Sequence, residues 1–149
     1  MNRFSKRFRF SDWPNPEVPL VAAGIYAIWS GEILVYCGMS GRQFDPVLAG
    51  AKKKHGLYTR LASHASGRLS GDQFCVYVAN RFVIPSVTPE MLSRFENGSL
   101  RLDELTKRYI HDKFDYQFTC VQDGPAAFKL EAECRSGLIF GVKPYLNPA

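Results

Sequence analysis

The stretch GIYAIWSGEILVYCG, residues 24–38, indicates the fold most directly. Two runs rich in β-branched and aromatic residues flank Gly31-Glu32, and glycine at the first central position suits the type II′ turn of a hairpin. Because successive side chains of a strand point to opposite faces, the pattern also predicts which residues share a face. The expected groups are Tyr26 with Ile28, Leu34 with Tyr36, and Ile25 with Ala27 and Trp29.

The rest of the chain alternates between helical and strand-like patterns. Leu57 and Leu61 recur one helical turn apart, and Thr88-Pro89 suits the start of a helix. The elements expected after the hairpin are a loop over 39–56, helices over 57–65, 89–98, 102–113 and 126–135, strands over 74–79 and 116–121, and a turn at 123–125. Together they predict an α+β domain with a small antiparallel β-sheet flanked by helices.

Length and composition limit the class of protein. With 149 residues, 46% hydrophobic and 13% aromatic, the chain suits one compact domain and is not a disordered chain. No apolar run approaches the roughly 18–20 residues of a membrane span. The basic N-terminus also lacks the apolar stretch of a secretory signal. We therefore expect a cytoplasmic protein without membrane association, with a basic, proline-rich lead over 1–23 and a domain over 24–149.

Positive charge is concentrated in the first half of the chain. Residues 1–70 hold 10 Lys and Arg against 4 Asp and Glu, a balance of +6, whereas residues 71–149 hold 9 against 10, a balance of −1. This asymmetry suits a polyanionic partner such as nucleic acid. Solvated charge without a partner gives the same pattern, so both interpretations stay open.

The four cysteines, Cys37, Cys75, Cys120 and Cys134, are singly placed. Zinc sites usually show paired C-x-x-C spacing, which this sequence lacks. The first three lie in apolar, strand-like runs, where a small buried side chain is expected. We therefore expect reduced, structural cysteines.

Five motifs follow one another along the chain in a recognisable order. They are GIY at 24–26, YCG at 36–38, LYTRLASH at 57–64, KLEAE at 129–133 and KPYLN at 143–147. In this order and combination they resemble the GIY-YIG nucleases, with Cys37 where that family usually has an aliphatic residue. The resemblance spans about residues 24–148 and implies that the 24–149 domain has the GIY-YIG nuclease fold.

The resemblance implies roles for four residues of the first three motifs. Tyr26 would act as general base or orient the attacking water, and Tyr36 would line the same site. Arg60 would clamp the scissile phosphate, because a guanidinium binds phosphate oxygens bidentately. His64, one turn further along the same helix face, would bind phosphate or move a proton. A phenol with a pKa of about 10 is a poor base at neutral pH, so Tyr26 would need a nearby cation or metal.

The C-terminal motifs imply a metal ligand and a supporting residue. The family places a glutamate on its last helix, typically after a leucine, so Glu131 after Leu130 fits best and Glu133 is the alternate. One carboxylate together with phosphate oxygens and water is a normal way to hold Mg²⁺, so Mg²⁺ or Mn²⁺ is the expected cofactor. Asn147 matches the terminal asparagine of the family's ending and would support the site by hydrogen bonding.

Basic residues near the motifs are candidates for contacts with the DNA backbone. Such contacts give salt-dependent affinity without sequence information. The candidates are Arg42, Lys52, Lys53, Lys54 and Arg68. Phe4, Phe8 and Phe10 of the basic N-terminal segment would either accompany its arginines onto DNA or staple the segment to the core.

The resemblance therefore implies a metal-dependent endonuclease that hydrolyses phosphodiester bonds in DNA, in a restriction, repair or structure-selective role. RNA as the substrate stays open. The alternative is a non-catalytic nucleic-acid-binding module that kept the fold. Cys37 and the 16 positions between Glu131 and Asn147, a longer gap than is usual in the family, would suit that alternative.

Overall fold

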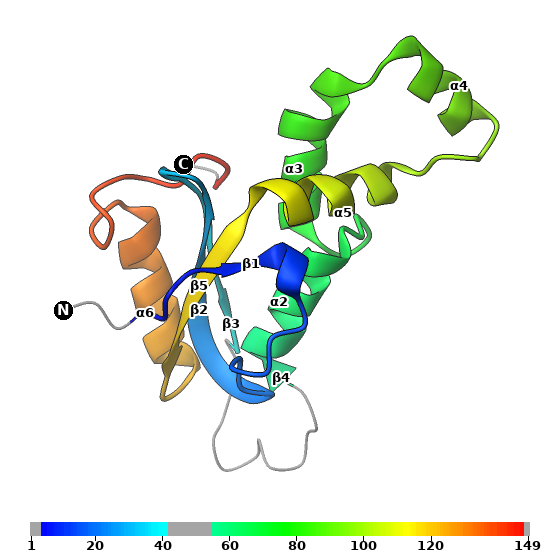
Figure 1. Cartoon of the computed structure of the whole chain (residues 1–149). Coiled ribbons are helices and arrows are strands. Elements are labelled where there is room, and N and C mark those ends of the chain that lie inside the picture. The colour runs from blue at the N-terminus through cyan, green and yellow to red at the C-terminus, as the bar shows by residue number, and fades with distance from the viewer. Residues whose placement is uncertain (1–3, 42–54, 148–149) are drawn as a thin grey trace.

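A small five-stranded sheet lies at the centre of the computed structural model, which describes residues 4–41 and 55–147 (Figure 1). The strands are β1 (Phe8–Arg9), β2 (Val21–Ser30), β3 (Ile33–Ser40), β4 (His55–Gly56) and β5 (Asp115–Val121). Their order is β1-β5-β2-β3 with antiparallel neighbours, and β4 adds a short parallel pairing to β2. Within the described residues, β2 is therefore central and β3 forms an edge.

Helices cover both faces of this sheet. They are η1 (Phe10–Asp12), α2 (Leu57–Ser66), α3 (Gln73–Val78), η2 (Ala79–Val83), η3 (Ile84–Ser86), α4 (Pro89–Glu96), α5 (Leu102–Lys113) and α6 (Gly124–Arg135). In Figure 1, α6 lies on one side of the sheet and α2, α3 and α5 lie on the other. The predicted α+β fold, with a small antiparallel sheet flanked by helices, is confirmed. None of the helices in the described ranges is both long and apolar enough to cross a membrane.

Each face of the sheet has its own apolar core. Tyr26 and Ile28 pack on the side of α2, α3 and α5, in a cluster that includes residues of all three helices. Ile25, Ala27 and Trp29 pack on the opposite side, against residues of α6. The faces predicted for the first strand of the hairpin are therefore confirmed.

The second strand departs from simple alternation. Leu34 belongs to the core under α6, whereas Tyr36 packs against the opposite core, so the prediction that they share a face is wrong. The cause is a register shift: Ile28 pairs with Tyr36, but its neighbour Trp29 pairs with Leu34. Such a β-bulge adds one residue to a strand and reverses the alternation beyond it. The bulge turns Tyr36 toward the face that holds Tyr26.

The turn and most of the helices form as the sequence predicts. Gly31 has a φ of 57°, and Ser30 pairs with Ile33 across the two-residue turn. The Thr88 hydroxyl caps α4 by accepting from the Met91 N–H. The predicted turn at Asp123 is instead the start of α6, because the Asp123 carboxylate accepts from the Ala126 N–H and caps that helix.

The run FCVYVA, residues 74–79, is helical, so the predicted strand is wrong. It forms most of α3 and leads into the π-helical turn η2. Asp72 starts this helix, because its side chain accepts from the Cys75 N–H, and the residues that follow bury Phe74, Cys75 and Val78. The periodicity of a short apolar run cannot distinguish a strand from a buried helix. The Asp72 cap is the feature of this sequence that indicates a helix.

The N-terminal segment packs against the sheet. Phe8 belongs to β1, which pairs with β5, and Phe10 is completely buried in the core. Phe4 packs against the other core, with its ring 5.1 Å from that of Phe140. Of the two interpretations of these phenylalanines, the structure supports the one in which they attach the N-terminal segment to the core.

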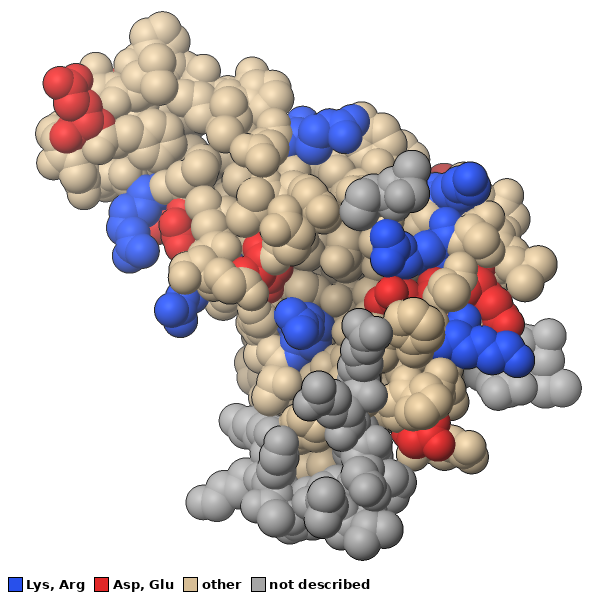
Figure 2. Space-filling model, turned by 180° about the vertical axis from the view of Figure 1, so that it is seen from behind, with Lys and Arg blue, Asp and Glu red and all other residues tan. Residues whose placement is uncertain are grey.

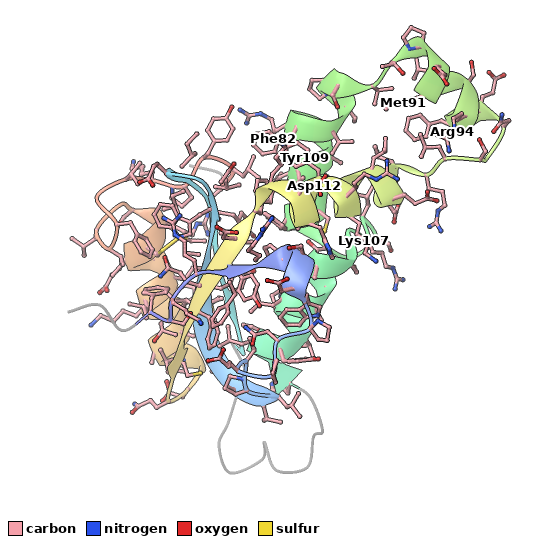
Figure 3. The ribbon with its side chains drawn as sticks, viewed as in Figure 1. Phe82, Met91, Arg94, Lys107, Tyr109 and Asp112 are labelled. Atoms are coloured by element: carbon pink, nitrogen blue, oxygen red, sulfur yellow. A yellow bond between two sulfur atoms is a disulfide. The ribbon has the colours of Figure 1, made fainter. Side chains whose placement is uncertain are left out.

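A helical arm, residues 84–101, extends from the top of α3 and returns into α5. Figure 3 shows Phe82 and Tyr109 side by side at the base of this arm, where their rings stack with centroids 5.4 Å apart. Further out, α4 buries none of its residues. An apolar groove of about 430 Å³ runs along the arm and is lined by Ile84, Val87, Leu92, Phe95 and Leu102.

Two of the four cysteines form a disulfide, so the expectation of four reduced cysteines is wrong. Cys37 of β3 is bonded to Cys134 of α6, at a sequence separation of 97 residues. Both lie in the core between the sheet and α6, which brings them together only in the folded chain. Cys75 is buried as expected, although in a helix, whereas Cys120 is exposed.

Candidate functional site

A pocket of about 200 Å³ lies beside the edge strand β3. It is lined by Tyr26, Tyr36, Gly38, Met39, Arg60, His64, Gln73, Phe74 and Glu131. Because β3 is the sheet edge within the described residues, side chains from α2 on one face and α6 on the other meet across it. Five of the six residues predicted to be catalytic therefore share one pocket.

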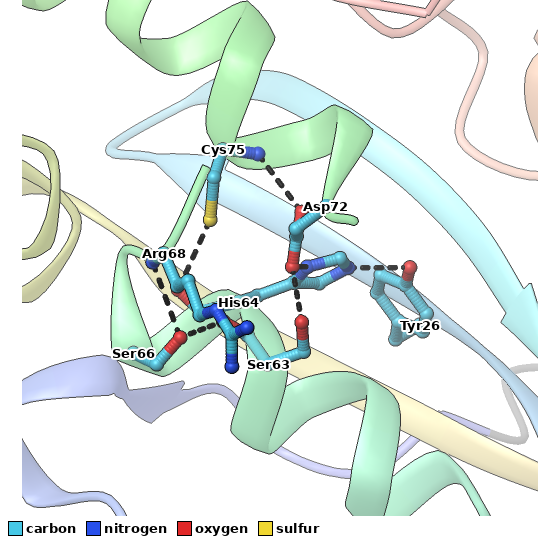
Figure 4. A network of polar contacts seen from close by, with 7 residues as sticks. All are labelled: Tyr26, Ser63, His64, Ser66, Arg68, Asp72 and Cys75. Atoms are coloured by element: carbon cyan, nitrogen blue, oxygen red, sulfur yellow. Dashed lines mark hydrogen bonds and ion pairs between the residues drawn. The ribbon is translucent and has the colours of Figure 1, made fainter. Parts of the chain in front are cut away.

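A buried hydrogen-bond chain begins at Tyr26 and His64, which line the pocket, and continues to residues behind them (Figure 4). The Tyr26 hydroxyl lies 2.7 Å from His64 Nε2, and His64 Nδ1 lies 2.7 Å from Asp72 Oδ2. The Ser63 hydroxyl donates to the same Asp72 oxygen at 2.6 Å. Asp72 Oδ1 accepts from the Cys75 N–H at 2.9 Å. Tyr26, His64 and Asp72 are each no more than 2% exposed, so water does not compete for these bonds.

Burial sets the protonation states along this chain. It raises the pKa of Tyr26 well above the usual value, and Tyr36 adds to that effect while the Arg60 charge opposes it. Burial also raises the pKa of Tyr36 to about 12. It lowers the pKa of His64 below the usual 6.5, despite the opposing hydrogen bond and charge of Asp72. At neutral pH both phenols and the imidazole are therefore uncharged.

Asp72 is the charged member of the chain. Burial acts to raise the pKa of its carboxyl group. The hydrogen bond and the charge of His64, together with the hydrogen bonds from Ser63 and the Cys75 amide, outweigh this and lower the pKa to about 2. Asp72 is therefore a carboxylate at neutral pH, able only to accept hydrogen bonds.

Arg60 and Glu131 bring opposite charges to the pocket. Arg60 is exposed on α2, one turn before His64, and its charge partly opposes the rise in the pKa of both tyrosines. Glu131 comes from α6, and its side chain is 18% exposed with Arg135 Nη1 3.5 Å from its Oε1. A cation and a carboxylate on opposite walls suit a phosphate and a divalent metal respectively.

The structure separates the two candidate metal ligands. Glu131 lines the pocket that holds both tyrosines. Glu133 lines a different pocket, together with Phe4, Val121 and Leu130. Two residues along a helix are about 200° apart, so these two carboxylates point to different sides of α6. Only Glu131 shares a pocket with Arg60 and the tyrosines.

Asn147 lies beside the pocket and is not part of its lining. Its side chain accepts from the Cys37 N–H at 2.8 Å and donates to the Cys37 carbonyl at 2.9 Å. Tyr145 and Leu146 add backbone bonds to Leu34 and Val35. The C-terminal segment is thus attached to β3 next to Tyr36.

His64, Asp72 and Cys75 form a buried group that could hold a metal ion, since one ligand atom of each lies within 4.8 Å of the others. Competing bonds already use these atoms. Both ring nitrogens of His64 have partners, and the Cys75 thiol donates to the His64 carbonyl with its pKa raised by burial. A metal would have to displace these bonds and deprotonate the thiol.

The structure adds little support for the predicted contacts with the DNA backbone. Arg42, Lys52, Lys53 and Lys54 lie outside the described residues. Arg68 is exposed just beyond α2 and does not line the pocket. On the face shown in Figure 2, Lys and Arg side chains lie among Asp and Glu side chains and do not form one basic patch.

Sequence reasoning missed Met39 of the pocket lining and three consecutive residues: Asp72 behind the pocket, and Gln73 and Phe74 in its lining. All three lie at the start of α3, the helix predicted to be a strand. An aspartate that precedes an apolar run is a typical N-cap, and that signal would have predicted the helix and its carboxylate together.

No protein-family model, curated protein or solved structure matches this chain.

Proposed function

We propose that this protein is a metal-dependent endonuclease of the GIY-YIG type, which hydrolyses phosphodiester bonds in DNA. The observation that carries the proposal is the pocket beside β3. It gathers Tyr26, Tyr36, Arg60, His64 and Glu131, which lie on four separate elements of the chain. Phosphodiester hydrolysis needs an activated water, stabilised charge on the phosphate oxygens and help for the leaving oxygen.

Arg60 is suited to bind the scissile phosphate. Its guanidinium is a cation that offers two parallel N–H donors to the phosphate oxygens. Its exposure on α2 leaves it accessible to a strand of nucleic acid that passes over the pocket. In this role Arg60 would stabilise the charge that builds up on the non-bridging oxygens as water attacks.

Tyr26 and His64 are suited to activate the attacking water. A free phenolate is disfavoured at Tyr26 because burial raises its pKa. Its hydroxyl, however, lies 2.7 Å from His64 Nε2, so it can pass its own proton to the ring as it takes one from the water. The water oxygen forms the new P–O bond, and the leaving oxygen departs with the electron pair of the scissile P–O bond and takes a proton from solvent. The proton that Tyr26 gives up resides on His64.

Glu131 suits the metal. Its carboxylate is a hard oxygen donor, and an ion with one protein carboxylate keeps places for phosphate oxygens and water, as Mg²⁺ prefers. A bound Mg²⁺ or Mn²⁺ would supply positive charge near the phosphate and the leaving oxygen. The Tyr36 hydroxyl, on the same wall as Tyr26, would face the phosphate as a neutral donor because its pKa is about 12.

The test is a cleavage assay on supercoiled, branched and single-stranded DNA and on RNA, with Mg²⁺ or Mn²⁺. We expect nicking or cutting of DNA by the wild type. Arg60→Ala should lower the rate by about 10²–10³-fold, as removal of a charge-stabilising donor does. Arg94→Ala is its matched control, because Arg94 is an exposed arginine on α4 of the helical arm and does not line the pocket. Glu131→Gln and Glu133→Gln form a second pair, of which only the first should abolish cleavage.

The same assay distinguishes the alternatives. Binding to DNA without cleavage under any divalent metal would favour a non-catalytic binding module. Cleavage of RNA alone would keep the chemistry and change the substrate. An inactive Glu133→Gln beside an active Glu131→Gln would overturn the assignment of the metal ligand.

A further inference from the structure

Asp72 lies behind the pocket, and none of the five motifs includes it. Its side chain is completely buried, and each of its oxygens has a partner. Oδ1 accepts from the Cys75 N–H at the start of α3, and Oδ2 accepts from the Ser63 hydroxyl. His64 Nδ1 lies 2.7 Å from the same Oδ2. The carboxylate therefore joins the cap of α3 to the imidazole on α2.

The partners of His64 determine where its proton resides. A carboxylate only accepts hydrogen bonds, so the ring nitrogen beside Asp72 must carry the hydrogen. A neutral imidazole with hydrogen on Nδ1 has a lone pair on Nε2. That lone pair faces the Tyr26 hydroxyl at 2.7 Å, in position to take its proton. The opposite tautomer would place two acceptors together at Asp72.

We propose that Asp72 is a positioning residue, whose Oδ2 holds His64 in the Nδ1–H tautomer so that Nε2 can accept the Tyr26 proton. The catalytic part of this proposal rests on the proposed nuclease function. When water forms its bond to phosphorus, one proton moves from water to Tyr26 and another from Tyr26 to Nε2. The leaving oxygen keeps the electron pair of the broken P–O bond and takes a proton from solvent. The resulting imidazolium is paired with the Asp72 carboxylate, which stays unprotonated.

Asp72→Asn reverses the expected tautomer with little change of shape. Asparagine is as good an N-cap as aspartate, so its oxygen should keep the bond to the Cys75 N–H. Its NH₂ group then faces His64 Nδ1, which must accept, and the hydrogen moves to Nε2. A ring protonated on Nε2 donates to Tyr26 and cannot take its proton.

The test combines ¹⁵N NMR of the histidine rings with cleavage kinetics. The chain has only three histidines, and a His64→Gln variant assigns the His64 signals. We expect Nδ1–H in the wild type and Nε2–H in Asp72→Asn. We also expect kcat of Asp72→Asn to fall by about 10²–10⁴-fold, with KM for DNA little changed. Ser63→Ala is the matched control, because it removes the other side-chain bond to Oδ2 and should leave both tautomer and kcat nearly unchanged.

The tautomer measurement needs no cleavage, so it separates this proposal from the function on which it rests. An inactive wild type with an Nδ1–H ring would contradict the nuclease function. An active wild type with an Nε2–H ring would contradict the role of Asp72, as would an Asp72→Asn variant that keeps both tautomer and kcat. Zinc bound at His64, Asp72 and Cys75 would also overturn the proposal, since the metal would then occupy the ring nitrogen.

Discussion

At the scale of single residues, Gly38 is as important for the pocket as the groups around it. A Cβ at this position would overlap the Tyr26 hydroxyl, although the backbone of Gly38 is not left-handed. Gly38→Ala should therefore displace Tyr26, lower kcat by about 10²-fold and cost about 1–3 kcal/mol of stability. The measurements are cleavage rates and urea unfolding.

Gly98→Ala is the matched control for this change. Gly98 lies in the helical arm with a φ of 81°, where a Cβ would meet open space, so alanine costs stability through backbone strain alone. We expect its kcat to stay at the wild-type value. A Gly38→Ala variant with wild-type kcat would mean that the Tyr26 hydroxyl is not needed where it lies.

The protonation states of His64 and Asp72 predict how stability depends on pH. The pKa of His64 is lower in the folded protein than in the unfolded chain, so the unfolded chain takes up the proton first. Stability should therefore fall as the pH drops below about 6.5, by at most about 1.4 kcal/mol per pH unit from this group. Asp72, with a pKa of about 2 against the usual 3.8, adds a further loss between about pH 4 and pH 2.

Urea unfolding of the wild type and His64→Gln between pH 7.5 and pH 5 measures the first of these losses. His55 and His111 are the same in both proteins, so the difference in slope belongs to His64. The wild type should lose more stability on acidification than the variant. Equal slopes would mean that His64 titrates alike in the folded and unfolded states.

At the scale of elements, the sequence predicts best where local signals agree. The hairpin at Gly31 and the helix at Leu57 have both a clear period and a turn or end signal, and both form as predicted. The helix α3 has one local signal, the Asp72 cap, which the apolar run that follows it hides. The bulge before Tyr36 does not follow from local patterns. The direction of Tyr36 depends on strand register, which only the assembled sheet determines. Asp72 caps the helix that was predicted to be a strand, so its position beside the site was not predicted either.

The Cys37–Cys134 disulfide was also beyond local patterns, and it predicts a loss of stability on reduction. It connects β3 to α6, one turn from Glu131, across a sequence separation of 97 residues. Loops of this length lose much entropy when closed, so reduction should lower the free energy of unfolding by about 2–4 kcal/mol. Unfolding with and without a reductant measures this, and Cys120→Ser, at an exposed cysteine, should leave the difference unchanged. Four reactive thiols in the unreduced, denatured protein would contradict the cross-link.

At the scale of the whole molecule, the candidate site belongs to the edge of the sheet and to no single element. Tyr26 and Tyr36 come from the hairpin, whereas Arg60 and Glu131 come from helices on opposite faces. The motifs identified these residues because each is marked locally by its neighbours in sequence. Their meeting point follows from the strand order, in which β3 is the edge within the described residues. Strand order depends on pairing between distant segments, which a single sequence does not display.

The C-terminal segment, residues 145–147, is hydrogen-bonded to the edge strand β3, and these bonds predict how a change at Asn147 affects the site. Asn147 makes two hydrogen bonds to the backbone of Cys37, next to Tyr36 and to the disulfide. Asn147→Ala removes both, so we expect a loss of about 1–3 kcal/mol of stability. The part of β3 that carries Tyr36 should also become less ordered, which should lower kcat more than it raises KM. Asn97→Ala is the control, because Asn97 caps an exposed turn in the helical arm through a bond to the Ser99 N–H. If Asn147→Ala loses stability but keeps its kcat, the segment supports the fold alone and the site does not depend on it.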